Sequence, residues 1–352
     1  MTTRTQWIHG PLTDAVLAWL WLPIFVVVHL AEGHGDLVPA LMAIGFVISF
    51  AHQPLTMGLV YGDPVQYRHH RRLYLVTPVV LAVLVTVGMF WSLTAVAIVA
   101  ALWNAEHTLM QRYGLTRIYG RKAGDDLGRI EKPMYISWLV FALLWLPSFV
   151  NLPKMADNLG FGARNKRGLE VLYDLRGPAR ALLVVGAVVA VVFTVRWLLA
   201  QRRLAPAQRS APKYLYVGAT FGLVLAIMVD PAAGFVSYIS AHALEYFVIV
   251  DASLRKRAAT GDPVAVIRAV QTRRRRALVY TSYLAAMVAV SVVTIGWFDG
   301  QFYAWLVLFF GGLHVFYDGF VWKLRRPGTA ASLGIPATVG VPPTVAPAPA
   351  VG

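Results

Sequence analysis

The chain has 352 residues, of which 58% are hydrophobic and 14% are charged, and its formal net charge is +15. It has no cysteine, so disulfides, thiolate metal ligands and a nucleophilic cysteine are excluded. Repeated apolar stretches of about 20 residues indicate an all-α, polytopic helical membrane protein that lies in the lipid bilayer. The Lys and Arg residues form short clusters between these stretches, which membrane topology explains better than binding to nucleic acid.

About ten apolar segments follow one another, and each is predicted to form a transmembrane helix. Their approximate bounds are 11–31, 37–60, 73–91, 92–111, 133–150, 179–200, 214–230, 232–252, 277–297 and 302–322. Basic clusters follow the even-numbered segments, at residues 68–72, 117–132, 202–213, 255–276 and 323–326. Because positive charge gathers on the cytoplasmic side, we expect the chain in the inner (cell) membrane with both termini in the cytoplasm.

Three regions outside these segments carry separate expectations. The loop 151–178 is basic although it would face outward, and its apolar residues favour a position on the membrane surface. Residues 258–276 combine apolar side chains with a run of arginines and predict a short interfacial helix. Residues 1–326 then form the transmembrane domain, and the Pro-, Ala- and Gly-rich residues 327–352 are expected to be a disordered cytoplasmic tail.

Four histidines lie deep inside even-numbered apolar segments, and they are His52, His107, His242 and His314. Their helices would all run in the same direction, so the rings are expected roughly 15 to 23 Å below the outer helix ends, at about 1.5 Å per residue. An ionisable group at membrane depth costs roughly 2.5 kcal/mol or more, and it normally faces a bundle interior where something binds it. The four residues therefore predict one common site, for which a buried metal ion is the simplest partner.

Two of these histidines are followed by a carboxylate one helical turn later: His242 by Glu245 and His314 by Asp318. Residues at this spacing share a helix face and can present two polar groups to one point. Nitrogen and carboxylate oxygen together suit iron, manganese or zinc. We expect Glu245 to be a fifth ligand or a proton acceptor, and Asp318 to take part in catalysis or to orient His314.

The first segment adds His29 and Glu32, again one turn apart, followed by His34. His29 falls nearer the outer face than the other four histidines, so it either completes their metal site or belongs to a separate outer cluster. Whether Glu32 and His34 accompany it stays open.

A short internal similarity predicts a parallel duplication. The residues Ile-Ser-Phe-Ala-His at 48–52 resemble Ile-Ser-Ala-His at 239–242, and each is followed two segments later by another buried histidine. Segments one to four would then correspond to segments seven to ten, a plan common in polytopic membrane folds. In an alanine-rich chain a match of this length is also expected by chance.

The abundance of histidine resembles that of integral-membrane desaturases and hydroxylases, although their His-x-x-x-His and His-x-x-His-His boxes are absent from this chain. Neutral histidines with one or two carboxylates leave an iron ion with open positions for dioxygen, and a site inside the bilayer is reached by apolar molecules. The sequence therefore predicts a membrane-embedded, metal-dependent oxidoreductase, with non-haem iron, that acts on a lipid-soluble small molecule. Its electron donor is not identified.

Two alternatives of other classes stay open. Paired buried histidines on neighbouring helices could instead be the axial ligands of haem. In a proton- or ion-coupled transporter, the histidines would form a relay with Glu106 and Glu245, and no stoichiometric metal would be bound.

Overall fold

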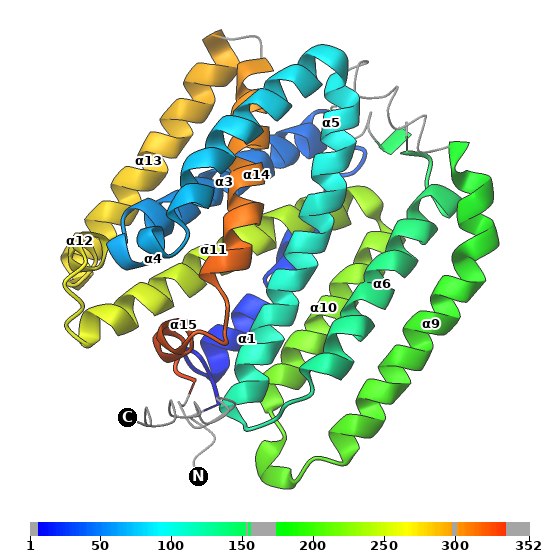
Figure 1. The fold of residues 1–352 in the computed structure, drawn as a ribbon. Coiled ribbons are helices and arrows are strands. Elements are labelled where there is room, and N and C mark those ends of the chain that lie inside the picture. Colours follow the sequence, from blue (N-terminus) through cyan, green and yellow to red (C-terminus); the bar gives the residue numbers. More distant parts are fainter. Residues whose placement is uncertain (1–5, 153, 156–173, 298–300, 336–352) are drawn as a thin grey trace, which may run out of the picture.

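The computed structural model describes residues 6–152, 154–155, 174–297 and 301–335 (Figure 1). Within these ranges every regular element is a helix, and no strand occurs. In chain order the helices are α1 (Pro11–Trp19), α2 (Trp21–Leu30), α3 (Leu37–Tyr61), α4 (Pro64–His69), α5 (Arg71–Lys122), α6 (Gly128–Phe149), α9 (Arg176–Arg202), the 3₁₀ turn η2 (Pro206–Gln208), α10 (Ala211–Val229), α11 (Pro231–Ala259), α12 (Ala265–Ala269), α13 (Arg273–Trp297), α14 (Gln301–Val321) and α15 (Pro327–Ser332).

Eight of the described helical segments are long and apolar enough to cross a membrane, and α1 and α2 together make the first of them. The protein is therefore an all-α polytopic membrane protein, as the sequence predicts. The two remaining predicted segments, 92–111 and 133–150, are helical within α5 and α6 but are not among the eight. The internal duplication stays a prediction.

Turn chemistry marks the helix ends where the apolar pattern breaks. Ser92 has non-helical backbone angles (φ −165°, ψ 99°) and divides α5 into two halves, and its hydroxyl accepts a hydrogen bond from the backbone N–H of Ala95. Asp230 begins α11 in the same way, because its side chain accepts the N–H of Ala233 and Pro231 occupies the first turn. Both breaks fall at boundaries that the sequence predicts.

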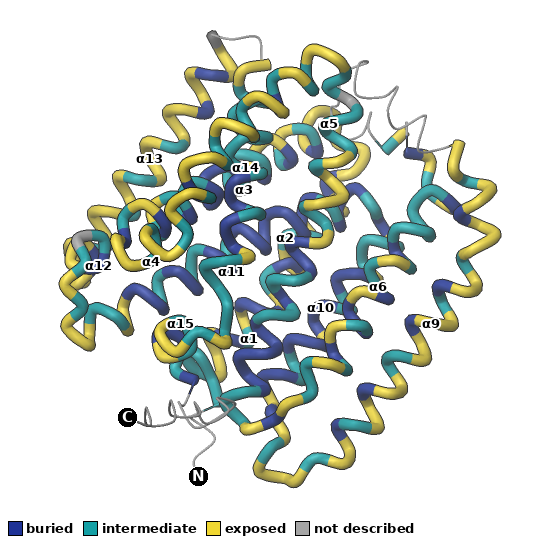
Figure 2. Tube along the Cα trace, in the orientation of Figure 1, coloured by how far each residue is buried: buried dark blue, intermediate teal, exposed yellow. Residues whose placement is uncertain are grey.

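Helix α11 is the centre of the bundle. Of the eight apolar windows its own is the most buried, at 78%, whereas the first half of α5 and α13 are buried to only 11% each. Figure 2 shows this gradient, with the buried positions along α11 and its neighbours and the exposed ones on outer helices such as α9 and α13. Helix α11 packs against α2, α3 and α10, and α14 packs against α3 and α5. This packing brings together the four helices that carry the buried histidines.

A buried network of four charges joins the adjoining ends of α5, α6 and α10. Asp125 accepts hydrogen bonds from Arg117 (2.9 Å) and from Lys213 (2.7 Å). Glu131 receives the same two cations, with Arg117 at 2.7 Å and Lys213 in direct contact. All four side chains are buried, and each charge has a partner of opposite sign, which is how buried charges are usually kept in a fold.

The first residues of the expected disordered tail are folded. Residues 327–332 form α15, and Leu333 and Ile335 are buried in an apolar cluster with Leu17 and Ala18. Apolar residues of this short stretch therefore pack against the bundle even though the composition has no periodicity. Residues 336–352 lie outside the described residues, as do residues 156–173 of the loop expected on the membrane surface. Within 258–276, α12 confirms the predicted short helix.

Candidate metal centre

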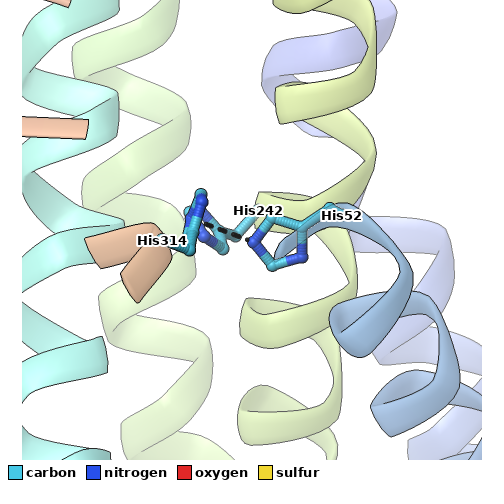
Figure 3. Close-up of side chains that lie close together, drawn as sticks. All are labelled: His52, His242 and His314. Atoms are coloured by element: carbon cyan, nitrogen blue, oxygen red, sulfur yellow. Dashed lines mark hydrogen bonds between the residues drawn. The ribbon is translucent and has the colours of Figure 1, made fainter. Parts of the chain in front are cut away.

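The four predicted histidines lie together in the middle of the bundle. His52 comes from α3, His107 from the second half of α5, His242 from α11 and His314 from α14, and all four side chains are buried. Figure 3 shows three of the rings close together between their helices. Because each ring comes from a different helix, the site is assembled only when these four helices pack.

The ring nitrogens are spaced as neighbouring ligands of one ion would be. Nε2 of His314 lies 3.2 Å from Nε2 of His52 and 3.0 Å from Nε2 of His107. Donor atoms of His52, His242 and His314 also lie within 4.8 Å of one another. With metal–nitrogen bonds of about 2.0 to 2.1 Å, two adjacent ligands stand about 2.8 to 3.4 Å apart, from octahedral to tetrahedral angles. The two measured distances fall in that interval.

His242 is the ring whose polar atoms need an explanation. Neither of its nitrogens has a hydrogen-bond partner, although the side chain is buried. Its ring stands edge-on to those of His52 (centroids 4.8 Å apart) and His107 (5.1 Å). A buried polar group without a partner costs about 1 to 3 kcal/mol, so this side chain points to a ligand that engages its lone pair.

A hydrogen-bond network fixes the orientation of His314. Its Nδ1 lies 2.7 Å from the hydroxyl oxygen of Thr56, and that hydroxyl donates to Oδ1 of Asp318 (3.0 Å). Tyr246 donates to the same carboxylate oxygen (2.8 Å). The hydroxyl of Thr56 also contacts the hydroxyl of Tyr246 (2.5 Å). When Thr56 gives its proton to Asp318, Nδ1 of His314 is the donor toward Thr56. Nε2 of His314 is then left with a free lone pair, which is the form that binds a metal.

Asp318 is also close to the ring nitrogens themselves. Its Oδ2 lies 3.8 Å from Nε2 of His314 and 3.9 Å from Nε2 of His107. These three residues form a second possible ligand group, which shares His314 with the first. The sequence leaves two roles open for Asp318, to orient His314 or to take part in catalysis. Its position is compatible with both, because one oxygen contacts Thr56 and the other lies near the ring nitrogens.

Glu245 does not face the histidines. Its carboxylate forms a buried ion pair with Arg112 of α5, and both side chains are only 1% exposed. Neither possible ligand group contains Glu245. The expectation of a fifth ligand does not agree with this arrangement, because the carboxylate is already compensated by a guanidinium. Arg112 also donates to the carbonyl of Ala18 (3.3 Å), so its charge is held from two sides.

His29 lies away from the four central histidines. Its Nδ1 lies 2.7 Å from Oδ2 of Asp230, at the start of α11. Twelve residues of helix separate Asp230 from His242, which corresponds to about 18 Å at 1.5 Å per residue. The expectation that His29 completes the central site is therefore wrong, and the alternative of a separate cluster holds. His34 is exposed, and its ring contacts the backbone carbonyl of Glu32.

Three residues of this region were not selected from the sequence as site residues, namely Thr56, Tyr246 and Arg112. The signal for the first two is their spacing, since Thr56 lies four residues after His52 and Tyr246 four residues after His242. Arg112 carries only the general signal of a charge close to a buried histidine on the same helix. Comparisons with protein-family models, curated proteins and solved structures found no match to this chain.

Proposed function

We propose that the protein is a membrane-embedded, metal-dependent oxidoreductase, with a non-haem iron held by His52, His107, His242 and His314. The observation that carries this proposal is the convergence of four buried imidazoles from four helices, with two pairs of Nε2 atoms 3.0 and 3.2 Å apart. The substrate would be a lipid-soluble small molecule, because the ligands belong to helices whose outer surfaces are apolar. Electrons would come from a separate donor.

The number of ring N–H donors supports a cation between the four histidines, because hydrogen bonds among the rings alone would leave several nitrogens without a partner. A neutral imidazole has one donor nitrogen and one acceptor nitrogen. With Nδ1 of His314 donating to Thr56, its Nε2 can accept from either His52 or His107, but not from both. One of these close contacts, and both nitrogens of His242, would then lack a partner. A metal ion bound by the lone pairs would engage one nitrogen of each ring, including one of the two on His242.

The same geometry supports one ion and argues against haem. His314 has a single free nitrogen and belongs to both possible ligand groups, so the two groups describe one centre. Ligands on opposite sides of an ion, as in bis-histidine haem, stand about 4 Å apart when each bond is about 2.0 Å. The Nε2 pairs at 3.0 and 3.2 Å are closer than that, and a porphyrin ring would have to pass between them.

The choice of iron rests on chemistry. Imidazole and carboxylate ligands suit iron, manganese and zinc, and an octahedral iron with four histidine ligands keeps positions for dioxygen or for a substrate. Asp318 would hold His314 in its binding tautomer through Thr56, and its second oxygen would stand next to the open positions. Iron would supply the redox chemistry, while the protein excludes water and delivers protons through the buried hydroxyls.

A proton- or ion-coupled transporter is the second candidate. The observation that favours it is the buried ion pair of Arg112 and Glu245, since paired ionisable residues inside membranes often mark ion pathways. This candidate expects no stoichiometric metal, so metal content separates the two functions.

The test is metal analysis and an optical spectrum of the full-length protein purified in detergent. We expect about one iron per chain and no Soret band, and we expect His242→Ala and His314→Ala each to lose most of the iron. His70→Ala is the matched control, because this histidine lies outside the centre on the short connection between α4 and α5. A Soret band would establish haem, and the absence of a stoichiometric metal that His242→Ala and His314→Ala remove would leave the transporter.

A further inference from the structure

A second group of metal-type ligands lies at the N-terminal end of α11, away from the histidine centre. It consists of His29 at the end of α2, Glu32 in the following turn, and Asp230, which begins α11. One donor atom from each residue lies within 4.8 Å of the other two. Residues about 200 positions apart in the sequence therefore lie close together, and none of them belongs to the proposed iron centre.

The carboxylate of Asp230 is held in place by the helix that it begins. Its Oδ1 accepts the backbone N–H of Ala233 (3.0 Å), while its Oδ2 faces Nδ1 of His29 (2.7 Å). The side chain is only 7% exposed, so it has little freedom to turn away. One oxygen thus serves the helix cap, and the other is directed at His29 and Glu32.

The ring of His29 is oriented from its own helix. It stacks on Phe25, one turn earlier, with ring centroids 5.8 Å apart and an interplanar angle of 7°. Stacking presents Nδ1 to Asp230, and the side chain is 51% exposed, so an ion from solution can reach the ring. The 2.7 Å between Nδ1 and Oδ2 is a hydrogen bond, so an ion that binds both atoms replaces the shared proton and moves the two atoms apart by a few tenths of an ångström.

Side chains compensate the two carboxylates at this point only in part, through His29 and through Lys154, whose charge acts on Glu32. Glu32 brings a second carboxylate beside Asp230, and a single imidazole compensates at most one of them even when it is protonated. Two carboxylates that share a site repel each other unless a proton or a cation lies between them. A divalent cation would compensate both, and a nitrogen with two carboxylate oxygens is a ligand set that zinc accepts.

We propose that His29, Glu32 and Asp230 form a second divalent-cation site, with zinc as the ion that it binds best. Nδ1 of His29 and one oxygen from each carboxylate are the protein ligands, and water fills the remaining positions. The bound ion connects the end of α2 to the start of α11, the helix that carries His242. About 18 Å of helix separates the two sites, so neither needs the other in order to bind its ion.

The experiment counts zinc on the full-length chain in detergent after treatment with a chelator. The zinc ion alone is the probe, and the double variant His242→Ala/His314→Ala supplies a background without the histidine centre. We expect this background to bind one zinc per chain and to lose it when His29→Ala is added. Asp230→Asn should weaken binding at least tenfold while keeping the fold, because Asn caps a helix as well as Asp does.

His34→Ala is the control, since it removes a nearby exposed histidine that is not a ligand, and it should leave zinc binding unchanged. The wild-type chain gives a second measurement that does not depend on the background variant, because His29→Ala should remove one zinc equivalent there as well. Zinc binding that survives His29→Ala in both chains would overturn the proposal, and so would equal loss with His34→Ala. A wild type without iron at the centre, but with one zinc that His29→Ala removes, would contradict only the proposed oxidoreductase.

Discussion

At the scale of single residues, His314 is the histidine of the proposed centre with the most polar contacts. One of its nitrogens is committed to Thr56, and the other stands next to two further histidines. A ring with both nitrogens engaged in this way cannot flip without losing contacts on both sides. The hydroxyl of Thr56 therefore determines which nitrogen of His314 is available to a metal, although it does not bind the metal itself.

We expect Thr56→Val to lower iron affinity by about 10- to 100-fold, because it keeps the side-chain shape but removes the oxygen that holds His314. Thr56→Ser keeps the hydroxyl and should retain most of the affinity. The measurement is competition for iron between each purified variant and a chelator of known affinity. Wild-type affinity in Thr56→Val would show that the hydroxyl does not fix the tautomer of His314.

At the scale of helices, the sequence predicts the elements well but not the partner that each polar residue meets. Apolar length and turn residues place most helix boundaries within a few residues, including the break at Ser92 and the start of α11 after Asp230. The four histidines were also predictable, because uniform depth on parallel helices follows from segment length. Helix boundaries and the depth of a residue along its helix depend on the local sequence, so they can be predicted from it.

The position of Glu245 could not be predicted in this way. Residues three apart on a helix differ by about 60° around its axis, and on a helix covered from all sides that angle separates two different neighbours. Helix α11 is such a helix, so His242 meets the other three histidines while Glu245 meets Arg112, which lies five residues after His107 on α5. Sequence spacing shows which residues share a face, whereas tertiary packing decides what the face contacts.

The charge network between α5, α6 and α10 is an element-scale feature with a dependence on pH. Burial alone would raise the pKa of Asp125, but Lys213 and Arg117 together hold it below its ordinary value of 3.8. A carboxyl group with a lowered pKa in the folded state contributes stability above its ordinary pKa. That contribution is lost as the pH falls through the lower pKa of the folded state.

We expect Asp125→Asn to reduce the free energy of unfolding by about 3 to 5 kcal/mol at pH 7, because it leaves Lys213 and Arg117 with one carboxylate between them. The difference in stability between wild type and variant should shrink as the pH falls below about 4, where Asp125 of the unfolded chain takes up a proton, and it should vanish below the lower pKa of the folded state. Thermal unfolding in detergent across this range measures both effects. A difference that stays constant down to pH 3 would contradict the assignment to Asp125.

At the scale of the whole molecule, contacts between distant parts of the chain bear on its orientation. Lys122, at the end of α5, donates to the carbonyl of Trp7 (2.7 Å), and Arg121 donates to the carbonyl of Leu324 (2.9 Å). The segment before α1, the end of α5 and the residues after α14 therefore lie on one side of the bundle. The number of crossings between them is even, as the alternating basic clusters predict, when the second half of α5 and α6 are counted with the eight candidate spans.

We predict from the basic clusters that this side is cytoplasmic, because Lys and Arg are retained there during insertion. A cytoplasmic reporter fused after Arg326, or inserted between α12 and α13, should then be active, and a periplasmic reporter at either position should be silent. The turn between α13 and α14 is the matched control and should give the opposite pattern. Periplasmic activity after Arg326 would reverse the orientation of the chain. Active periplasmic reporters on both sides of α14 would contradict its crossing of the membrane, and with it the common direction of the helices that carry the four central histidines.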